Sequence, residues 1–356
     1  MGCNVLHVYN DFEPDKGGVA RHIAGVAETV VVHGITVRVL AQNTDNVAGN
    51  GVYQVIKAGW LALWRHVIWA NVVHVHGARK PYAVFAAVLA ALLRRRIIYT
   101  PHCFYDEDCN NAKRFAKRLW DATAERWMMR RCAAVILLSE YWYHYLASRN
   151  LSVANPVIIP NCVIGRDIDR RCVPRGDSLQ GKPALLSVGR LDPVKRLDDA
   201  IRVLTCPALA EAMLHVVGRG PDESRLIELA KNLGVASRVR FYGFADDAEV
   251  ARMAAAADVF VMPSAAEGMP TVVIEMLLMG LPVAASDIPG NRAILDLTGL
   301  SALFPVGDIS RMAERIMAVA KNPVSDADVN VVRENFTWER TTHRIAALYL
   351  GQESTL

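Results

Sequence analysis

Residues 258–286 read DVFVMPSAAEGMPTVVIEMLLMGLPVAAS: an apolar strand that ends at Met262, a loop that contains Gly268, a helical segment and a second apolar strand from Pro282. Continuous apolarity of this kind is typical of strands in a parallel sheet that is covered on both faces. The stretch therefore predicts a strand–helix–strand unit of a doubly wound α/β domain.

The same alternation of strands and helices runs through both halves of the chain. The predicted strands are 5–9, 36–40, 52–56, 72–76, 97–100, 134–138 and 157–159, and then 184–188, 214–217, 239–242, 258–262 and 282–286. Between residues 161 and 183 the periodicity gives way to a polar, turn-rich stretch. At about 150 residues per domain, the 356 residues are expected to form two domains, 1–170 and 171–335, with ligands at the carboxyl ends of the strands.

Composition excludes several classes of protein. The chain is 52% hydrophobic and 21% charged, which is typical of a globular protein and not of a disordered or fibrous one. Its seven cysteines include no CxxC pair, so we expect reduced thiols rather than a disulfide framework or a zinc ribbon. No secretory signal opens the sequence, and the longest apolar run, residues 83–93, falls short of the roughly 20 residues that span a bilayer. We therefore expect a cytoplasmic protein.

Positive charge is concentrated in the first half of the chain. Residues 1–170 hold 20 Lys and Arg against 13 Asp and Glu, whereas residues 171–356 hold 20 against 23. In the segment 113–131 the cations alternate with Phe115, Leu119 and Trp120, as in a helix that lies on an anionic membrane surface. The alternative is a helix that packs these apolar residues into the domain and leaves its charges solvated. Nucleic acid is not expected as a partner.

The first domain offers one candidate phosphate site. No GxGxxG motif follows the first predicted strand, which weakens a nicotinamide-binding interpretation. Gly17 and Gly18 nevertheless precede a predicted helix, and residues without side chains let backbone N–H groups and the positive helix end approach a phosphate. A tight strand-to-helix turn without a ligand is the alternative.

Two cations in the second domain lie where a strand leads into a helix. Arg190 follows the strand 184–188, and Lys195 comes shortly after it. Cations in this place can hold a diphosphate and stabilise the negative charge that develops when it leaves. A surface salt bridge for each cation is the alternative.

Two glutamates lie in the stretch 258–286. Glu267 and Glu275 are eight positions apart, which in a helix corresponds to about 12 Å, farther than the carboxylates of a glycosidase pair. We therefore expect them to hold different parts of one elongated ligand, the hydroxyls of a sugar and those of a ribose. The helix start around residues 268–272 would offer backbone donors to a phosphate between them.

Taken together, these motifs resemble those of the retaining GT-B glycosyltransferases of family 4, whose donors are sugar nucleotides. The matching residues are Gly17-Gly18, His102 within 100–104, Gly189-Arg190-Leu191 with Lys195, residues 217–221, Glu267, Glu275 and residues 280–283. Arg219 departs from the smaller residue common in its turn. The resemblance implies a GT-B fold, in which two doubly wound Rossmann-like domains face a cleft and a C-terminal helix, 336–356, returns to the first domain.

The resemblance also implies a role for each matching residue. His102, Glu267, Arg190 and Lys195 would be catalytic: His102 near the transferring sugar, Glu267 on the donor hexose and the two cations on the diphosphate. The implied donor-binding residues are Gly17, Gly18, Arg190, Lys195, Glu267, Gly268, Met269, Pro270, Thr271 and Glu275, with Glu275 on the ribose.

The activity that the resemblance implies is transfer of a hexose from a UDP- or GDP-sugar to a glycan or polyprenyl-linked acceptor, with retention, in bacterial cell-surface polysaccharide synthesis. No other cofactor is expected. An epimerase or phosphorylase of the same fold, or a sugar-binding module without catalysis, are the alternatives.

A catalytic metal is not expected. His74 and His76 alternate on a predicted strand and face one side, but two histidines without a third ligand are more often packing residues. Residues 106–108 and 167–169 resemble the DxD element of metal-dependent glycosyltransferases of the other architecture. Here cationic side chains can supply the charge that a metal would supply.

Overall fold

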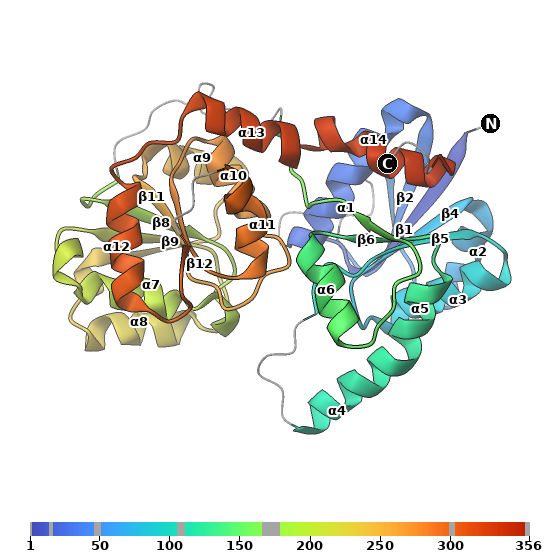
Figure 1. The fold of residues 1–356 in the computed structure, drawn as a ribbon, viewed down its shortest axis with the longest axis horizontal. Helices are drawn as coiled ribbons and strands as arrows, with labels where there is room; N and C mark the ends of the chain where they lie inside the picture. Colours follow the sequence, from blue (N-terminus) through green and yellow to red (C-terminus); the bar gives the residue numbers. More distant parts are fainter. Residues whose placement is uncertain are drawn as a thin grey trace. The chain divides into compact units, whose positions relative to one another are not determined.

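The structure is a computed structural model that describes residues 2–13, 17–45, 51–104, 111–165, 179–298 and 303–352. The chain forms two compact units (Figure 1). Unit 1 comprises residues 1–163 and 338–356, and unit 2 comprises residues 164–337. The divisions after residues 163 and 337 lie close to the boundaries predicted after residues 170 and 335. The C-terminal helix belongs to unit 1.

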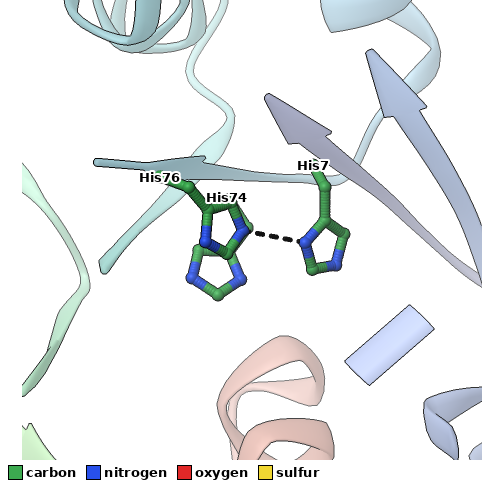
Figure 2. A group of neighbouring side chains, drawn as sticks. All are labelled: His7, His74 and His76. Atoms are coloured by element: carbon green, nitrogen blue, oxygen red, sulfur yellow. Dashed lines mark hydrogen bonds between the residues drawn. The ribbon is translucent and has the colours of Figure 1, made fainter. Parts of the chain in front are cut away.

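Unit 1 contains a parallel sheet of seven strands in the order β3-β2-β1-β4-β5-β6-β7. The strands are β1 Cys3–Asp11, β2 Ile35–Asn43, β3 Gln54–Lys57, β4 Val72–His76, β5 Arg96–Thr100, β6 Ala134–Leu137 and β7 Pro156–Ile158. The order reverses between β1 and β4, where His7 pairs in register with His74. Figure 2 shows that His7, His74 and His76 project from these two strands toward the same side of the sheet.

Within the described residues, seven α-helices belong to unit 1. They are α1 Gly18–Thr29, α2 Leu63–Trp69, α3 Pro81–Leu92, α4 Asn111–Trp120, α5 Arg126–Arg131, α6 Glu140–Ser148 and α14 Trp338–Leu350. Alanine and glycine make up at least half of the residues that α1 and α3 bury. Helix α14 lies beside α1 (Figure 1). A Cβ atom at Gly25 of α1 would overlap the fully buried indole of Trp338, so this glycine sets how closely the two helices approach.

The predicted basic helix forms, with an interruption. A π-helical turn, Asp121–Glu125, joins α4 to α5, and both of its carboxylates are buried. Arg79 binds Asp121 at 2.7 Å, and the Glu125 carboxylate accepts hydrogen bonds from the Arg79 N–H and, at 2.8 Å, from the Tyr99 hydroxyl. The extra residue of the π turn thus brings both carboxylates to the same inward side as their partners.

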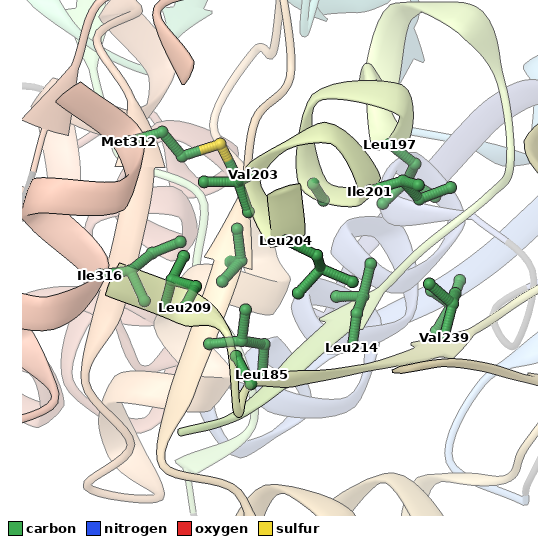
Figure 3. Close-up of a cluster of buried hydrophobic side chains, with 14 of the residues drawn as sticks. Leu185, Leu197, Ile201, Val203, Leu204, Leu209, Leu214, Val239, Met312 and Ile316 are labelled. Atoms are coloured by element: carbon green, nitrogen blue, oxygen red, sulfur yellow. The ribbon is translucent and has the colours of Figure 1, made fainter. Parts of the chain in front are cut away.

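Unit 2 contains a second parallel sheet, in the order β10-β9-β8-β11-β12-β13. Its strands are β8 Ala184–Val188, β9 Met213–Val217, β10 Val239–Gly243, β11 Val259–Met262, β12 Val283–Ser286 and β13 Leu303–Phe304. Its helices are α7 Leu197–Arg202, α8 Glu223–Asn232, α9 Asp247–Ala256, α10 Thr271–Leu278, α11 Pro289–Thr298, α12 Ile309–Val319 and α13 Asp326–Phe336. Leucine, isoleucine and valine side chains fill the core between the sheet and α7 and α12 (Figure 3).

Both sheets have the strand order of a Rossmann fold, and each therefore has one point at which the order reverses. The predicted strands form in both units, and β13, only two residues long, was not predicted. Within the described residues, we find no helix that is both long and apolar enough to cross a bilayer.

Candidate functional site

The order of the unit 2 sheet reverses between β8 and β11, and the loops that follow these strands are joined there. The Ala265 N–H donates to the Val194 carbonyl oxygen at 2.8 Å, which ties the loop after β11 to the short helical turn after β8. Ligands of open α/β sheets bind at such a point. Most of the residues predicted to bind the donor lie in these two loops.

Glycines let the loops after β8 and β9 lie in backbone contact. A Cβ atom at Gly218 would overlap the Gly189 carbonyl, and one at Gly220 would overlap the Leu191 carbonyl. The Leu191 N–H donates to the Arg219 carbonyl oxygen at 3.0 Å. Arg219, the departure from the family pattern, therefore contributes its backbone at this turn.

Lys195 and Glu267 form an ion pair across the reversal point. The Lys195 Nζ lies 2.6 Å from the Glu267 Oε1, and the side chains are 27% and 8% exposed. A carboxylate that is this buried is stable as an ion only with a partner. The pair thus holds one positive and one negative group side by side at the rim of the sheet.

Arg190 has a different partner. Its Nε lies 3.1 Å from the Asp192 Oδ2, and its side chain is 67% exposed. An exposed pair of this kind is worth about 0–1 kcal/mol. The guanidinium can therefore leave Asp192 for a stronger anion at little cost.

The second carboxylate, Glu275, is half-buried on α10. This helix begins at Thr271, four positions after Glu267, so Glu267 is not part of it. Gly268, Met269 and Pro270 are buried in the loop between them. The N-terminal N–H groups of α10 lie between the two carboxylates in sequence, as the sequence predicts for a phosphate site.

The loop between β11 and α10 is held in place by residues that were not predicted from the sequence. The Ser286 hydroxyl donates to the Ser264 carbonyl oxygen at 2.5 Å, and the Asn291 amide donates to the Ser286 carbonyl oxygen at 2.8 Å. A Cβ atom at Gly290 would crowd the Glu267 carbonyl. The Pro289-Gly290-Asn291 sequence at the start of α11 was the available signal for this support.

Unit 1 holds the remaining predicted residues. Gly17 precedes α1 with an extended backbone, and Gly18 is the first residue of this helix. Both glycines are exposed, and a Cβ atom at either would meet nothing within 4 Å. The start of this 12-residue helix is thus open to an anion, although the packing does not itself require glycine.

His102 follows β5 in a strained turn. Its φ is +63°, and the Cys103 N–H donates to the Pro101 carbonyl oxygen at 2.8 Å across it. This combination is found in γ-turns with positive φ, which are rare, and such backbone strain is concentrated at functional sites. The side chain points inward, because the residue is only 8% exposed.

His102 belongs to a cluster of five buried histidines that sequence analysis found only in part. His74 and His76 were expected to share a face, and His7, His22 and His102 join them. Two sets of three have ring nitrogens within 4.8 Å of one another, close enough to coordinate one ion: His7, His74 and His76, and His22, His76 and His102. The acidic residues 106–108 and 167–169, the other candidate ligands, lie outside the described residues.

Burial keeps these histidines uncharged. It lowers the pKa of His7 to about 3, with a smaller contribution from the charge of His22. It lowers the pKa of His22 to about 4, although the hydrogen bond that His22 Nδ1 donates to the Asn161 amide oxygen opposes this shift. Burial and the neighbouring histidines lower the pKa values of His74, His76 and His102 well below the usual 6.5.

Two Rossmann-order sheets, with a loop of charged residues at one reversal point and a glycine-started helix near the other, define a protein of the GT-B class. The chain is a glycosyltransferase with a GT-B fold. The family models "Glycosyltransferase Family 4" and "Glycosyl transferases group 1" match residues 16–164 and 174–335, respectively.

Similar proteins include several glycosyltransferases. A 2-deoxystreptamine glucosyltransferase of Streptomyces kanamyceticus is 27% identical over 300 residues, 79% of this chain and 76% of the relative. A phosphatidyl-myo-inositol mannosyltransferase of Mycobacterium leprae is 32% identical over 181 residues, 48% of this chain and 46% of the relative.

Two solved structures match nearly the whole chain. Sucrose-phosphate synthase from Thermosynechococcus elongatus has a TM-score of 0.79 at 20% identity, over 99% of this chain and 100% of that structure. Anabaena HepE in complex with UDP and glucose has a TM-score of 0.78 at 17% identity, over 99% of each. Both confirm the GT-B fold.

The five buried histidines of the unit 1 cluster make unfolding sensitive to acid. Their pKa values are lower in the folded chain than the 6.5 of the unfolded chain, so below about pH 6.5 the unfolded state binds more protons. We expect the free energy of unfolding to be highest above pH 6.5 and to fall as the pH drops toward 4. Each histidine that stays uncharged in the folded chain contributes at most about 1.4 kcal/mol per pH unit to this fall. Urea unfolding at pH 7.5 and pH 5 measures this slope.

Two variants separate this effect from other titrations. His7→Gln removes one buried histidine and should flatten the slope, whereas His33→Gln removes an exposed one and should leave it unchanged. Equal slopes in both variants and the parent chain would contradict the assignment to the cluster.

Proposed function

We propose that the chain transfers a hexose from a nucleoside diphosphate sugar to a glycan or lipid-linked acceptor, with retention of the anomeric configuration, in the assembly of bacterial cell-surface polysaccharide. The Lys195–Glu267 pair at the reversal point of the unit 2 sheet carries this proposal. It presents a cation and a carboxylate where α/β sheets bind ligands, next to the start of α10.

The two cations have complementary parts in this reaction. Lys195 is held in place by Glu267, so its charge is already positioned when the donor binds. Arg190 is exposed and weakly paired, and can close on the diphosphate. Together with the N–H groups of α10 they offset the negative charge that grows on the leaving diphosphate.

Retention is proposed to follow from attack on the face that the diphosphate leaves. The acceptor oxygen forms a bond to the anomeric carbon, the bond from this carbon to the diphosphate oxygen breaks, and a phosphate oxygen takes the acceptor proton. A protein nucleophile is then unnecessary. The ion pair supports this, because the charge of the Glu267 carboxylate is already paired with Lys195. We propose that Glu267 holds sugar hydroxyls and does not attack the anomeric carbon.

The named relatives support the classes of donor and acceptor. HepE binds UDP and glucose in its solved structure, which favours a nucleoside diphosphate sugar as donor here. The Mycobacterium leprae relative is named for a mannosyl transfer to phosphatidyl-myo-inositol, a lipid acceptor, and the Streptomyces relative for transfer to 2-deoxystreptamine. A panel of UDP- and GDP-sugars with lipid-linked and free acceptors therefore tests the proposal directly.

Loss of the positioned charges should stop turnover without unfolding the chain. Lys195→Gln keeps a hydrogen-bond donor for Glu267 but removes the charge, and Glu275→Gln removes the proposed ribose partner. We expect each to lower turnover by about two orders of magnitude, the scale on which a preorganised electrostatic contact acts. Turnover at saturating donor and the melting temperature are measured together.

Matched controls come from exposed ion pairs of the same unit. Lys231 pairs with Glu228 at 3.6 Å, and Glu314 with Arg311 at 2.7 Å. Lys231→Gln and Glu314→Gln should keep normal turnover. Normal turnover in Lys195→Gln or Glu275→Gln would show that the corresponding role is wrong, and release of product only with inorganic phosphate would favour a phosphorylase.

We also propose that the reaction needs no divalent ion, because Arg190, Lys195 and the start of α10 supply the charge stabilisation. Turnover should therefore persist in excess EDTA. Complete loss on chelation, with recovery in magnesium or manganese, would overturn this and direct attention to Asp106 and Asp167 as ligands.

Helix α4 favours a lipid-linked acceptor. It has no buried residue, and Phe115 and Leu119, one turn apart, are 69% and 57% exposed. The alternative in which these two residues pack into the domain core does not hold. Exposed apolar residues next to Arg114 and Arg118 are typical of a helix that lies at a membrane surface, which we propose as the place of action.

Binding of α4 to anionic lipid should depend on salt. Each basic residue near such a surface contributes about 1 kcal/mol, so we expect cosedimentation with anionic vesicles at low salt and not with neutral ones. Replacing Lys113, Arg114, Lys117 and Arg118 with Gln should abolish it. The control replaces Arg311 and Arg315 of unit 2 with Gln. Absence from both kinds of vesicle would leave α4 as a solvated helix.

A further inference from the structure

Four of the buried histidines form one continuous chain of hydrogen bonds with Tyr349 of α14. His102 Nε2 lies 3.2 Å from His76 Nδ1, and His76 Nε2 lies 2.9 Å from His7 Nδ1, the contact drawn in Figure 2. His7 Nε2 lies 3.2 Å from the Tyr349 hydroxyl, which lies 2.7 Å from His74 Nδ1. His74 Nε2 ends the chain on the Thr100 hydroxyl at 2.8 Å.

Each hydrogen bond in this series contains one proton. This limits how the protons can be distributed over the ring nitrogens. Because the histidines are uncharged, each has one N–H and one lone pair. If His76 donates to His102 through Nδ1, then His7 and His74 must also carry their protons on Nδ1. If His102 donates through Nε2, all of them carry their protons on Nε2. The four rings therefore share one tautomer.

One end of this series of hydrogen bonds is His102, whose backbone is strained. His102 has a left-handed φ, which costs about 1–3 kcal/mol and persists only where the surroundings enforce it. Its ring is held on one side by His76 and on another by the nearly perpendicular ring of His22, at 4.7 Å between ring centres. His22 is in turn fixed by a 2.9 Å hydrogen bond to Asn161.

We propose that His7, His74, His76 and Tyr349 are positioning residues that decide which ring nitrogen of His102 carries its proton. His102 Nε2 is taken by His76, so Nδ1 is the nitrogen left for a substrate. Whether Nδ1 donates or accepts is then set by the whole chain and not by local solvent. This inference rests on the proposed function, and within it on the role near the transferring sugar that the family resemblance implies for His102.

A shared tautomer would make His102 more selective in how it binds a sugar hydroxyl. A sugar hydroxyl can donate or accept, so an imidazole that is free to change tautomer recognises it in two ways. An imidazole with a fixed proton recognises it in one way, and a site built for one hydrogen bond discriminates more strongly. Through Tyr349, the C-terminal helix α14 contributes to this recognition.

A metal ion is the rival occupant of the cluster. His22 Nε2 is buried and has no hydrogen-bond partner among the described residues, and it belongs to the set with His76 and His102. An ion bound by the two nitrogens that face each other, His76 Nδ1 and His102 Nε2, would need both of their lone pairs, whereas the hydrogen-bond chain needs a proton between them. The two possibilities are therefore exclusive and can be told apart.

The test reads the tautomers directly. Two-bond proton–nitrogen NMR spectra of the histidine-labelled full chain distinguish Nδ1–H from Nε2–H rings, and single His→Gln variants assign the signals. We expect His7, His74, His76 and His102 to show the same tautomer. Mixed tautomers among the four would overturn the proposal, as would one equivalent of metal in the purified protein that is lost in His76→Gln.

Tyr349→Phe connects the chain to turnover. It removes the hydroxyl between His74 and His7 and keeps the ring, so His74 should become independent of the other three, and turnover should fall about tenfold, the equivalent of one buried hydrogen bond. The control is Tyr82→Phe, which removes another buried hydroxyl of unit 1, bound to the Ala58 carbonyl oxygen at 2.8 Å. Equal turnover in the two variants would overturn the positioning role.

Two further variants keep the result decisive. If Tyr349→Phe does not fold, Thr100→Val removes the hydroxyl at the far end of the same chain, with the same expected direction. His102→Ala tests the proposed function separately. Normal turnover in that variant would overturn the role of His102 and with it the positioning role, whereas mixed tautomers with an inactive His102→Ala would overturn the positioning role alone.

Discussion

A polar side chain inside a parallel sheet that is covered on both faces must find its hydrogen-bond partner within the protein, because no water reaches it. This requirement governs the centre of unit 1. His7 and His74 are neighbours in register on β1 and β4, and both are fully buried. They are satisfied only because Tyr349 and Thr100 complete the chain on either side.

The same need for a partner inside the protein applies to the site in unit 2. There the buried polar groups are charged side chains and not uncharged histidines. Glu267 is almost buried in the loop after β11, and Lys195 reaches it from the loop after β8. Both units therefore place their interdependent polar groups at the point where strand order reverses, between strands far apart in sequence. There the loops diverge to opposite faces of the sheet and leave room for a ligand.

The sequence predicted the two sheets well, because a strand buried on both faces must be apolar along its length. It also predicted that His74 and His76 share a face, since side chains alternate along a strand. That His7 joins them depends on how β1 pairs with β4, and apolar runs do not encode this register. The contact between Lys195 and Glu267, which are 72 positions apart, could not be predicted either, because it depends on which strands lie side by side.

The C-terminal helix shows that buried polar groups can depend on partners at the other end of the sequence. Trp338 packs against Gly25, the Thr342 hydroxyl bonds to that of Thr29 at 3.0 Å, and Tyr349 reaches the first strand. Helix α14 therefore does more than cover α1. Without the Tyr349 hydroxyl, both His7 Nε2 and His74 Nδ1 would lose the hydrogen-bond partner they have here. The polar interior of unit 1 is therefore complete only when the last helix has docked.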